Sequence, residues 1–133
     1  MKKRFWLFTA AALLLLAGCG AAEQPGNTYR QITQEEAAKM MQEQSGYILL
    51  DVRTQAEFEQ AHIPGAVCIP NETIGTDEIP ALPDKNQLIL VYCRSGNRSK
   101  QAAEKLAQLG YTNIVEFGGI NTWTGETVSG SES

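Results

Sequence analysis

The sequence predicts an α/β domain in which helices cover both faces of a small, mostly parallel sheet. Short apolar runs typical of buried strands alternate along the chain with segments that carry helix-start signals. The composition fits this prediction. Of the 133 residues, 43% are hydrophobic and 20% are charged, which suits a single globular domain and not a disordered chain.

Three segments are predicted to be helical. Two begin with a capping box, in which a threonine is followed three residues later by a glutamate, and they cover about 33–44 and 54–61. The third helix covers about 99–109, with its leucines on one face, and Gly110 is placed to cap its end.

Four short apolar runs are predicted to be buried strands, at residues 47–50, 66–69, 88–92 and 114–117. A loop with one helical turn is expected between the second and third of these strands, and a frayed polar tail after Gly125. Ligands bind such sheets at the carboxyl ends of the strands. The loop that follows Tyr92 is therefore the first candidate site.

The first 18 residues are predicted to be a secretory signal. Basic residues at positions 2–4 precede an apolar run over residues 5–17. This run is shorter than the roughly 20 residues of a membrane-spanning helix, although an uncleaved anchor is the alternative.

The end of this signal, Leu16-Ala17-Gly18-Cys19, resembles a bacterial lipobox. The resemblance implies cleavage before Cys19 and lipidation of its thiol, whereas an ordinary signal-peptidase site is the alternative. Residues 19–29 would then form a lipidated anchor and flexible tether. The domain, residues 30–125, is expected outside the cytoplasm, lipid-anchored to a bacterial cell membrane, with residues 126–133 as a polar tail.

Charge and cysteine content exclude several classes of function. The formal net charge is −4; removing residues 1–18 would take away three of the 11 basic residues and none of the 15 acidic ones, leaving about −7. An acidic domain of this kind is a poor nucleic-acid binder. Cys68 and Cys93 would be the remaining thiols, and without a Cys-x-x-Cys pair a dithiol oxidoreductase is not expected. No cluster of metal ligands is present, so no metal is expected.

The loop after Tyr92 reads Cys93-Arg94-Ser95-Gly96-Asn97-Arg98 and leads into Ser99-Lys100 at a predicted helix start. Gly96 permits a tight turn, and the helix contributes the positive end of its dipole. Cationic residues also gather here, which indicates an anion site. These surroundings favour a thiolate at Cys93, which could attack electrophilic sulfur and hold the resulting persulfide. The alternative is a buried strand-end cysteine beside a solvated basic loop.

Further segments complete a pattern that resembles the rhodanese family over roughly residues 29–124. They are Leu50-Asp51-Val52-Arg53, Glu57-Phe58, His62-Ile63-Pro64-Gly65-Ala66, Tyr92 to Ser99, Leu109-Gly110-Tyr111, and Gly118-Gly119 with Trp123. The resemblance implies a rhodanese-like fold with a five-stranded sheet. It also implies that Cys93 is the catalytic residue, and that the loop residues Arg94, Ser95, Gly96, Asn97, Arg98 and Ser99 bind the substrate.

The implied activity is that of a sulfurtransferase without a cofactor. Cys93 would take sulfane sulfur from a small anionic donor such as thiosulfate and pass it, as a persulfide, to cyanide or a thiol acceptor. Well-known thiosulfate-using members carry a lysine where Ser95 stands, and an arginine shortly after the Asp-x-Arg motif where this chain has Gln55 and Glu57. The alternative is a non-catalytic binding or sulfide/redox-sensing module tethered to the membrane.

A tyrosine phosphatase is the competing enzyme, because its cysteine also lies in an anion-binding loop. Those loops place the arginine one residue further from the cysteine, where this chain has Ser99, and usually carry a histidine where Tyr92 stands. Phosphatase activity is therefore not expected.

Four other polar or thiol side chains are interpreted as scaffold. His62 is expected to form a structural turn, although a Cys–His dyad would have to use it. Asp51 and Arg53 leave the end of a buried strand, and Arg53 is expected to pair with Glu57 or Glu59, with a role in binding substrate as the alternative. Cys68 is expected to be a buried small hydrophobic residue, with a resolving thiol as the alternative.

Overall fold

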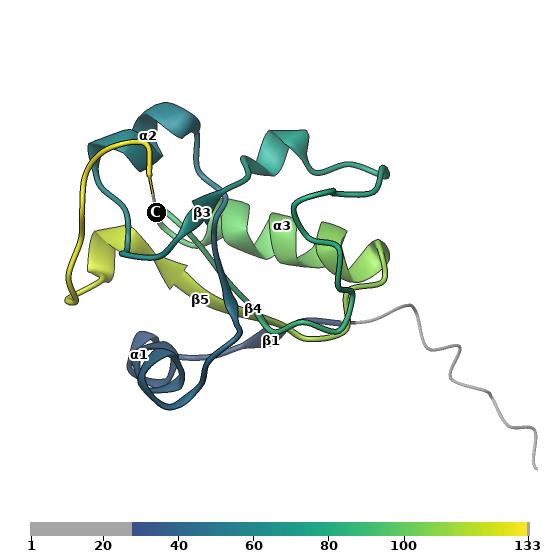
Figure 1. The fold of residues 1–133 in the computed structure, drawn as a ribbon, viewed down its shortest axis with the longest axis horizontal. Coiled ribbons are helices and arrows are strands. Elements are labelled where there is room, and N and C mark those ends of the chain that lie inside the picture. Colours follow the sequence, from purple (N-terminus) through teal and green to yellow (C-terminus); the bar gives the residue numbers. More distant parts are fainter. Residues whose placement is uncertain (1–27, 133) are drawn as a thin grey trace, which may run out of the picture.

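A five-stranded sheet in which all neighbouring strands are parallel lies at the centre of the domain (Figure 1). The computed structural model describes residues 28–132. The strands follow the order β1-β5-β4-β2-β3 across the sheet. They are β1 (Arg30–Gln31), β2 (Ile48–Asp51), β3 (Val67–Cys68), β4 (Ile89–Cys93) and β5 (Ile114–Gly119). The helices are α1 (Gln34–Glu43), α2 (Gln55–Gln60) and α3 (Asn97–Gln108), with 3₁₀ turns η1 (Asn71–Thr73) and η2 (Ile120–Thr122).

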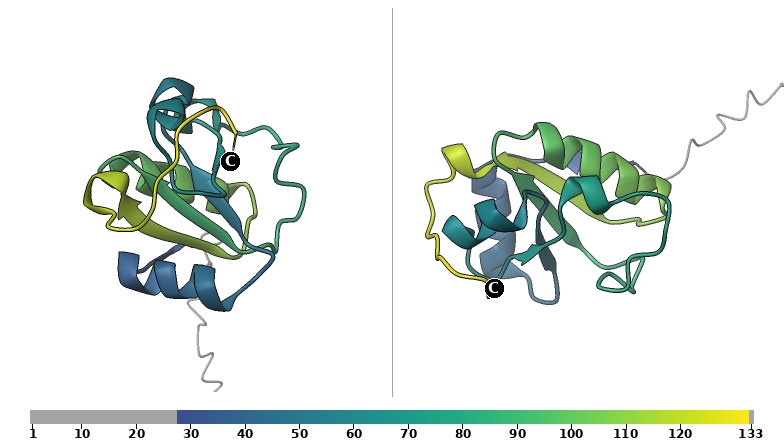
Figure 2. Two further views of the ribbon diagram at one scale, coloured as in Figure 1. Left: turned by 60° about the vertical axis from the view of Figure 1, so that its left-hand side comes forward. Right: turned by 90° about the horizontal axis from the view of Figure 1, so that it is seen from above.

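Both faces of the sheet are buried beneath helices, which confirms the predicted fold class (Figure 2). Successive residues of a strand point to opposite faces. On β4, Ile89, Val91 and Cys93 therefore pack in the core beneath α3, while Leu90 and Tyr92 pack in the core that includes α1 and α2. Every residue of β4 is buried, as expected for a central strand covered on both sides.

Two helices begin at the capping boxes that the sequence predicts. The hydroxyl of Thr33 accepts a hydrogen bond from the amide of Glu36, whose carboxylate accepts one from the Thr33 amide, and α1 starts at the next residue, Gln34. Thr54 and Glu57 form the same arrangement at the start of α2. These caps satisfy amide donors that a helix leaves free in its first turn.

Several local predictions are wrong in detail. The edge strand β1 contains exposed, polar residues and forms only through pairing with β5, so no apolar run signals it. The third helix begins at Asn97, two residues earlier than predicted. The strand predicted over 66–69 shortens to β3 at the other edge of the sheet, where Val67 is 40% exposed.

The polar C-terminal segment is not frayed at every position. Val128 and His62 exchange two backbone hydrogen bonds of 2.8 Å, and the Gly130 amide donates to the Glu59 carbonyl over 2.8 Å. The segment therefore closes over α2 and the residues that follow it.

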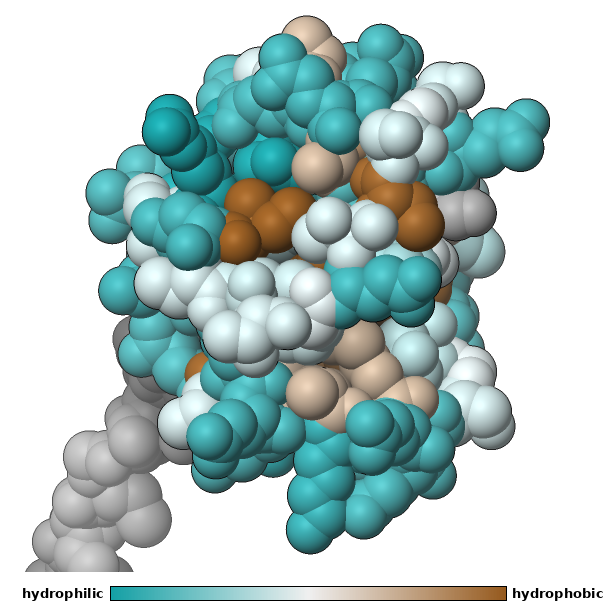
Figure 3. Space-filling view, turned by 90° about the vertical axis from the view of Figure 1, so that its left-hand side faces the viewer, coloured by the Kyte–Doolittle hydropathy of each residue, from teal (hydrophilic) through white to brown (hydrophobic). Residues whose placement is uncertain are grey.

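The face shown in Figure 3 is mostly polar, and strongly hydrophobic colour is confined to small separate patches. Within residues 28–132, no helix is long and apolar enough to cross a membrane. The predicted signal, the lipobox cysteine Cys19 and most of the predicted tether lie outside the described residues.

Candidate functional site

Cys93 is the last residue of the central strand β4 and lies at the bottom of the loop that follows it. Its side chain is only 1% exposed. The Gly96 amide donates to the Cys93 Sγ over 3.0 Å, and the thiol contacts the Ser99 hydroxyl at 3.4 Å. Because α3 begins at Asn97, the positive end of its dipole is directed at the sulfur. The Gly96 amide and the start of α3 thus both stabilise negative charge on the sulfur.

The backbone of Gly96 makes this turn possible. Its φ of 103° lies in the left-handed region, which residues with a Cβ rarely adopt. This conformation lets the chain reverse within three residues of Cys93 and directs the Gly96 amide back at the sulfur. The sequence prediction of a tight turn at Gly96 is confirmed.

A second glycine fixes the loop against the neighbouring strand. The pairing of β4 with β5 shifts register after Val91, so that Cys93 lies opposite Gly119. A Cβ on Gly119 would overlap the carbonyl of Arg94. That carbonyl accepts a hydrogen bond of 3.1 Å from the Asn121 amide. The first turn of the loop is therefore held by the end of β5 and the start of η2.

The Ser99 hydroxyl lies behind the thiol and contacts a buried carboxylate. Ser99 Oγ is 2.7 Å from Glu116 Oε1, which also accepts the Gly118 amide over 2.8 Å. Ser99 is fully buried and Glu116 is 2% exposed. The sequence analysis missed Glu116. A charged residue within an otherwise apolar strand run is the signal that could have found it, because glutamate is rarely buried unless it has partners.

Arg98 is engaged with helix α2 in this structure. Its Nη1 and Nη2 atoms donate to Glu57 Oε1 and Oε2 over 2.7 and 2.9 Å. The hydrogen bond from Arg98 is the main reason why the pKa of Glu57 falls to about 2, and the Glu57 carboxylate in turn raises the pKa of Arg98. The two-armed pair fastens the first turn of α3 to α2.

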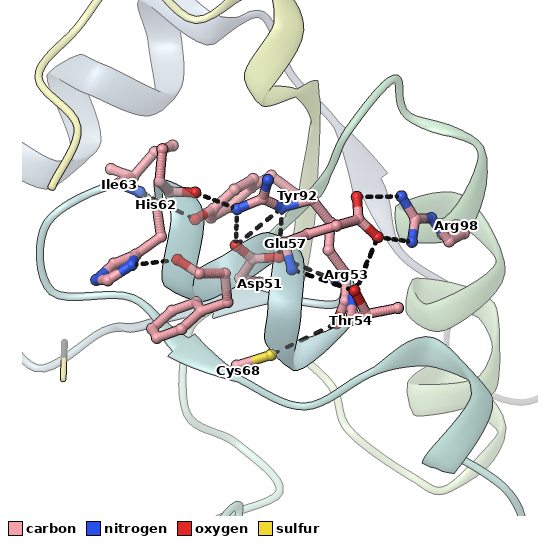
Figure 4. A network of polar contacts seen from close by, with 11 residues as sticks. Asp51, Arg53, Thr54, Glu57, His62, Ile63, Cys68, Tyr92 and Arg98 are labelled. Atoms are coloured by element: carbon pink, nitrogen blue, oxygen red, sulfur yellow. Dashed lines mark hydrogen bonds and ion pairs between the residues drawn. The ribbon is translucent and has the colours of Figure 1, made fainter. Parts of the chain in front are cut away.

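A second ion pair lies deeper, as Figure 4 shows. Arg53 Nη2 is 2.7 Å from Asp51 Oδ2 and also donates to the Ala61 carbonyl over 2.6 Å. Asp51 is fully buried and Arg53 is 5% exposed. The prediction that Arg53 pairs with Glu57 or Glu59 is therefore wrong, because the nearer carboxylate two residues away accepts its guanidinium. Both residues serve as scaffold, joining the end of β2 to the end of α2.

The comparison with known protein families matches residues 33–126 to the Rhodanese-like domain. The chain belongs to this family.

Relatives of known name agree with this assignment. The chain is 39% identical over 71 residues to thiosulfate sulfurtransferase PspE of Escherichia coli, a match that covers 53% of this chain and 68% of PspE. It is 36% identical over 96 residues to a sulfurtransferase of Allochromatium vinosum, covering 70% and 86% of the two chains. A solved structure described as a rhodanese with anions from E. coli superposes with a TM-score of 0.58 at 36% identity, over 63% of this chain and 99% of that one.

The single histidine of this rhodanese domain occupies a structural position. His62 is fully buried and its ring stacks on Phe58, with centroids 3.7 Å apart. Its Nδ1 donates to the Phe58 carbonyl over 2.8 Å, while Nε2 has no partner among the described residues. Neither hydrogen-bond partner of the Cys93 sulfur is His62, so the geometry provides no Cys–His dyad.

Cys68 differs from its prediction, because it is half-buried on the edge strand β3. Its thiol donates to the Arg53 carbonyl over 3.4 Å. Burial, followed by the charge of Asp51, raises the pKa of Cys68 to about 11. A thiol with this pKa remains protonated at neutral pH, which does not favour a resolving role.

The remaining predicted loop residues are divided between surface and interior. Arg94, Ser95 and Asn97 are exposed, whereas Gly96 and Ser99 are buried. Beside the loop lies an open cavity of about 380 Å³, whose lining includes Ser95, Gly96 and the buried Glu116. Within residues 28–132, no three His, Cys, Asp or Glu side chains come together as metal ligands.

Proposed function

We propose that this rhodanese domain is a sulfurtransferase that carries sulfane sulfur as a persulfide on Cys93. The observation that carries the proposal is the Gly96 amide, which donates to the Cys93 sulfur over 3.0 Å at the start of α3. A sulfur anion there is stabilised by an oriented N–H group and by a helix dipole, and needs no reorganisation of the loop.

The proposed substrate is a small anionic sulfur donor, with thiosulfate as the example. The Cys93 sulfur attacks the outer sulfur of the donor, a new S–S bond forms, and sulfite leaves with the electrons of the bond that breaks. Because the Arg98 guanidinium is paired with Glu57, Arg94 is the proposed cation for the departing anion. Cyanide or a thiol then attacks the outer sulfur and releases Cys93.

Attachment to a membrane through a lipidated Cys19 is part of the same proposal, and it predicts a sulfurtransferase outside the cytoplasm. Its support is the lipobox-like segment that ends the signal-like N-terminus. The test is expression of the chain in a bacterium, followed by membrane fractionation and mass spectrometry of the N-terminal peptide. An acylated Cys19 in wild type and a non-acylated, released Cys19→Ala variant are expected. An unmodified Cys19 in the membrane fraction would overturn the anchor.

Sulfur transfer is tested with the full chain in mild detergent, using thiosulfate as donor and cyanide as acceptor. Intact mass is recorded before cyanide is added. We expect wild type to gain the mass of one sulfur and then to form thiocyanate. Cys93→Ser should do neither, and the matched control Cys68→Ser should do both.

The outcomes separate the two candidate functions. Sulfur loading without transfer to cyanide or a thiol would favour a sensor. If neither thiosulfate nor a panel of polysulfide and persulfide donors loads sulfur on Cys93, the sulfurtransferase proposal is wrong and a binding module takes its place.

A further inference from the structure

Glu116 is a buried carboxylate next to the proposed nucleophile, and it has no ion-pair partner among residues 28–132. Its Oε1 contacts the Ser99 hydroxyl and the Gly118 amide, and its Oε2 lies 3.3 Å from the Gln31 Nε2 donor. Neutral donors alone hold this carboxylate in place, although burying a charge without a cation costs free energy. Its position calls for a functional explanation.

The hydrogen bonds that link Cys93, Ser99 and Glu116 run in one direction, from the thiol to the carboxylate. Ser99 has a single hydroxyl proton, and its nearest acceptors are Glu116 Oε1 at 2.7 Å and the Gly96 carbonyl at 2.9 Å. The Gly96 carbonyl already accepts the Lys100 amide, and a hydrogen bond to a charged oxygen is the stronger one. The Ser99 proton therefore points to Glu116. The Ser99 oxygen is left free to accept the Cys93 thiol at 3.4 Å.

We propose that Ser99 and Glu116 form a proton relay for Cys93, in which Glu116 acts as a positioning residue through the Ser99 hydroxyl. This inference rests on the proposed function of Cys93. The relay keeps one negative charge in the buried site. A thiolate and a carboxylate so close together would repel each other, whereas moving the proton transfers the charge from Glu116 to the sulfur.

The relay accounts for the proton in both halves of the proposed reaction, the loading of sulfur onto Cys93 and its discharge to the acceptor. During loading, the Cys93 sulfur bonds to the outer sulfur of the donor and sulfite leaves with its electron pair. The thiol proton passes to Ser99 Oγ, and the Ser99 proton passes to Glu116 Oε1. During discharge, the acceptor attacks the outer sulfur and the electron pair returns to Cys93 Sγ. The proton then returns from Glu116 through Ser99.

Few other titratable groups face Glu116. Tyr29, ahead of β1, has its pKa raised by burial and then by the charge of Glu116. Lys100 on α3 lines the same cavity but is exposed to solvent. Cys93 on β4 reaches Glu116 through Ser99. Of these groups, Cys93 is the one that is joined to Glu116 through a hydroxyl.

Glu116→Gln tests the relay because it removes the proton acceptor and keeps the shape. The glutamine oxygen can still accept from Ser99 and Gly118, and its amino group can donate to Gln31 after that amide flips. The rate of alkylation of Cys93 by iodoacetamide is measured from pH 5 to pH 10 in the full chain, with Cys93 identified by peptide mass spectrometry. We expect the midpoint of the alkylation profile to fall by about one pH unit, because the variant removes the like charge that opposes a Cys93 thiolate.

Two further variants complete the test. Ser99→Ala should slow sulfur loading as much as Glu116→Gln, and the double variant should be no slower than either, because each breaks the same relay. Glu116→Asp keeps a carboxylate and should recover part of the loading rate. The rate of sulfur loading from thiosulfate should fall by about a hundredfold in Glu116→Gln.

Two results would overturn the relay. An unchanged alkylation profile in a folded Glu116→Gln variant would make Glu116 only a brace for Gly118 and α3. A lower midpoint together with faster sulfur loading would make Glu116 only a repelling charge. Alkylation needs no sulfur donor, so failure of wild type to load sulfur contradicts the proposed function and not the relay.

Discussion

Arg98 and Glu57 meet through two N–H···O contacts of 2.7 and 2.9 Å, which join the first turn of α3 to the first turn of α2. Two-armed pairs of this kind fix the orientation of both partners. The relationship is notable because Glu57 also completes the capping box of α2 through Thr54. One carboxylate thus starts a helix and restrains the loop that follows Cys93.

We predict that Glu57→Gln separates these two roles. Glutamine also suits a capping box, so α2 should remain, while the loss of the ion pair should lower the free energy of unfolding by about 1 kcal/mol at pH 7. The pKa of Glu57 falls from 4.5 to about 2 in the folded protein. Its contribution to stability is therefore complete above pH 4.5 and is lost as the pH falls toward 2.

Urea unfolding at pH 7 and pH 3 checks this prediction. Wild type should lose more stability between the two values than Glu57→Gln does. The control is Glu59→Gln on the same helix, where the Glu59 carboxylate is exposed and bonds only to Gln55 among the described residues. Equal acid sensitivity in wild type and Glu57→Gln would show that the Arg98–Glu57 ion pair is not the source of this stability.

The close approach of Gly119 to Arg94 gives a second prediction. In Gly119→Ala the new methyl group would overlap the Arg94 carbonyl, which is backbone and cannot rotate away. We expect the free energy of unfolding to fall by about 3 kcal/mol, and sulfur transfer to fall by about a hundredfold because the loop moves relative to Cys93.

Gly75→Ala is the matched control, since nothing lies within 4 Å of its added methyl group. Its stability, measured by urea unfolding, should stay within about 0.5 kcal/mol of wild type. Wild-type activity in Gly119→Ala would show that the loop does not depend on this contact.

Cys68 provides a third prediction, because its pKa of about 11 is raised chiefly by burial. At pH 8 roughly one molecule in a thousand carries a Cys68 thiolate. Iodoacetamide should therefore leave Cys68 unmodified in the folded protein at pH 8 and modify it readily in urea. Peptide mass spectrometry gives the extent at each site, and rapid reaction of Cys68 in the folded state would count against the burial effect.

Features that depend on local chemistry could be predicted from the sequence. The two capping boxes and the strand over 88–92 are recognisable within a few residues, and the structure confirms them. Gly96 was predicted as a turn for the same reason, because its backbone freedom is a local property.

Features that depend on distant partners could not be predicted in this way. The strand β1 exists because Arg30 pairs with Val115, more than eighty residues away. The contact of Glu116 with Ser99 forms only when α3 packs on β5. Arg53 had several carboxylates within reach along the chain, and the geometry of a buried strand end selected Asp51.

Because the strands are all parallel, the entry of the chain and the loop that follows Cys93 lie at different ends of the sheet. The chain enters through β1, where Arg30 lies beside Val115, whereas Cys93 lies beside Gly119 further along the same strand β5. At about 3.3 Å per residue, these levels are about 13 Å apart along β5. The chain therefore enters the domain at the end of the sheet opposite the loop that follows Cys93. Dissolved ions can reach the exposed residues Arg94, Ser95 and Asn97 without passing this point of entry.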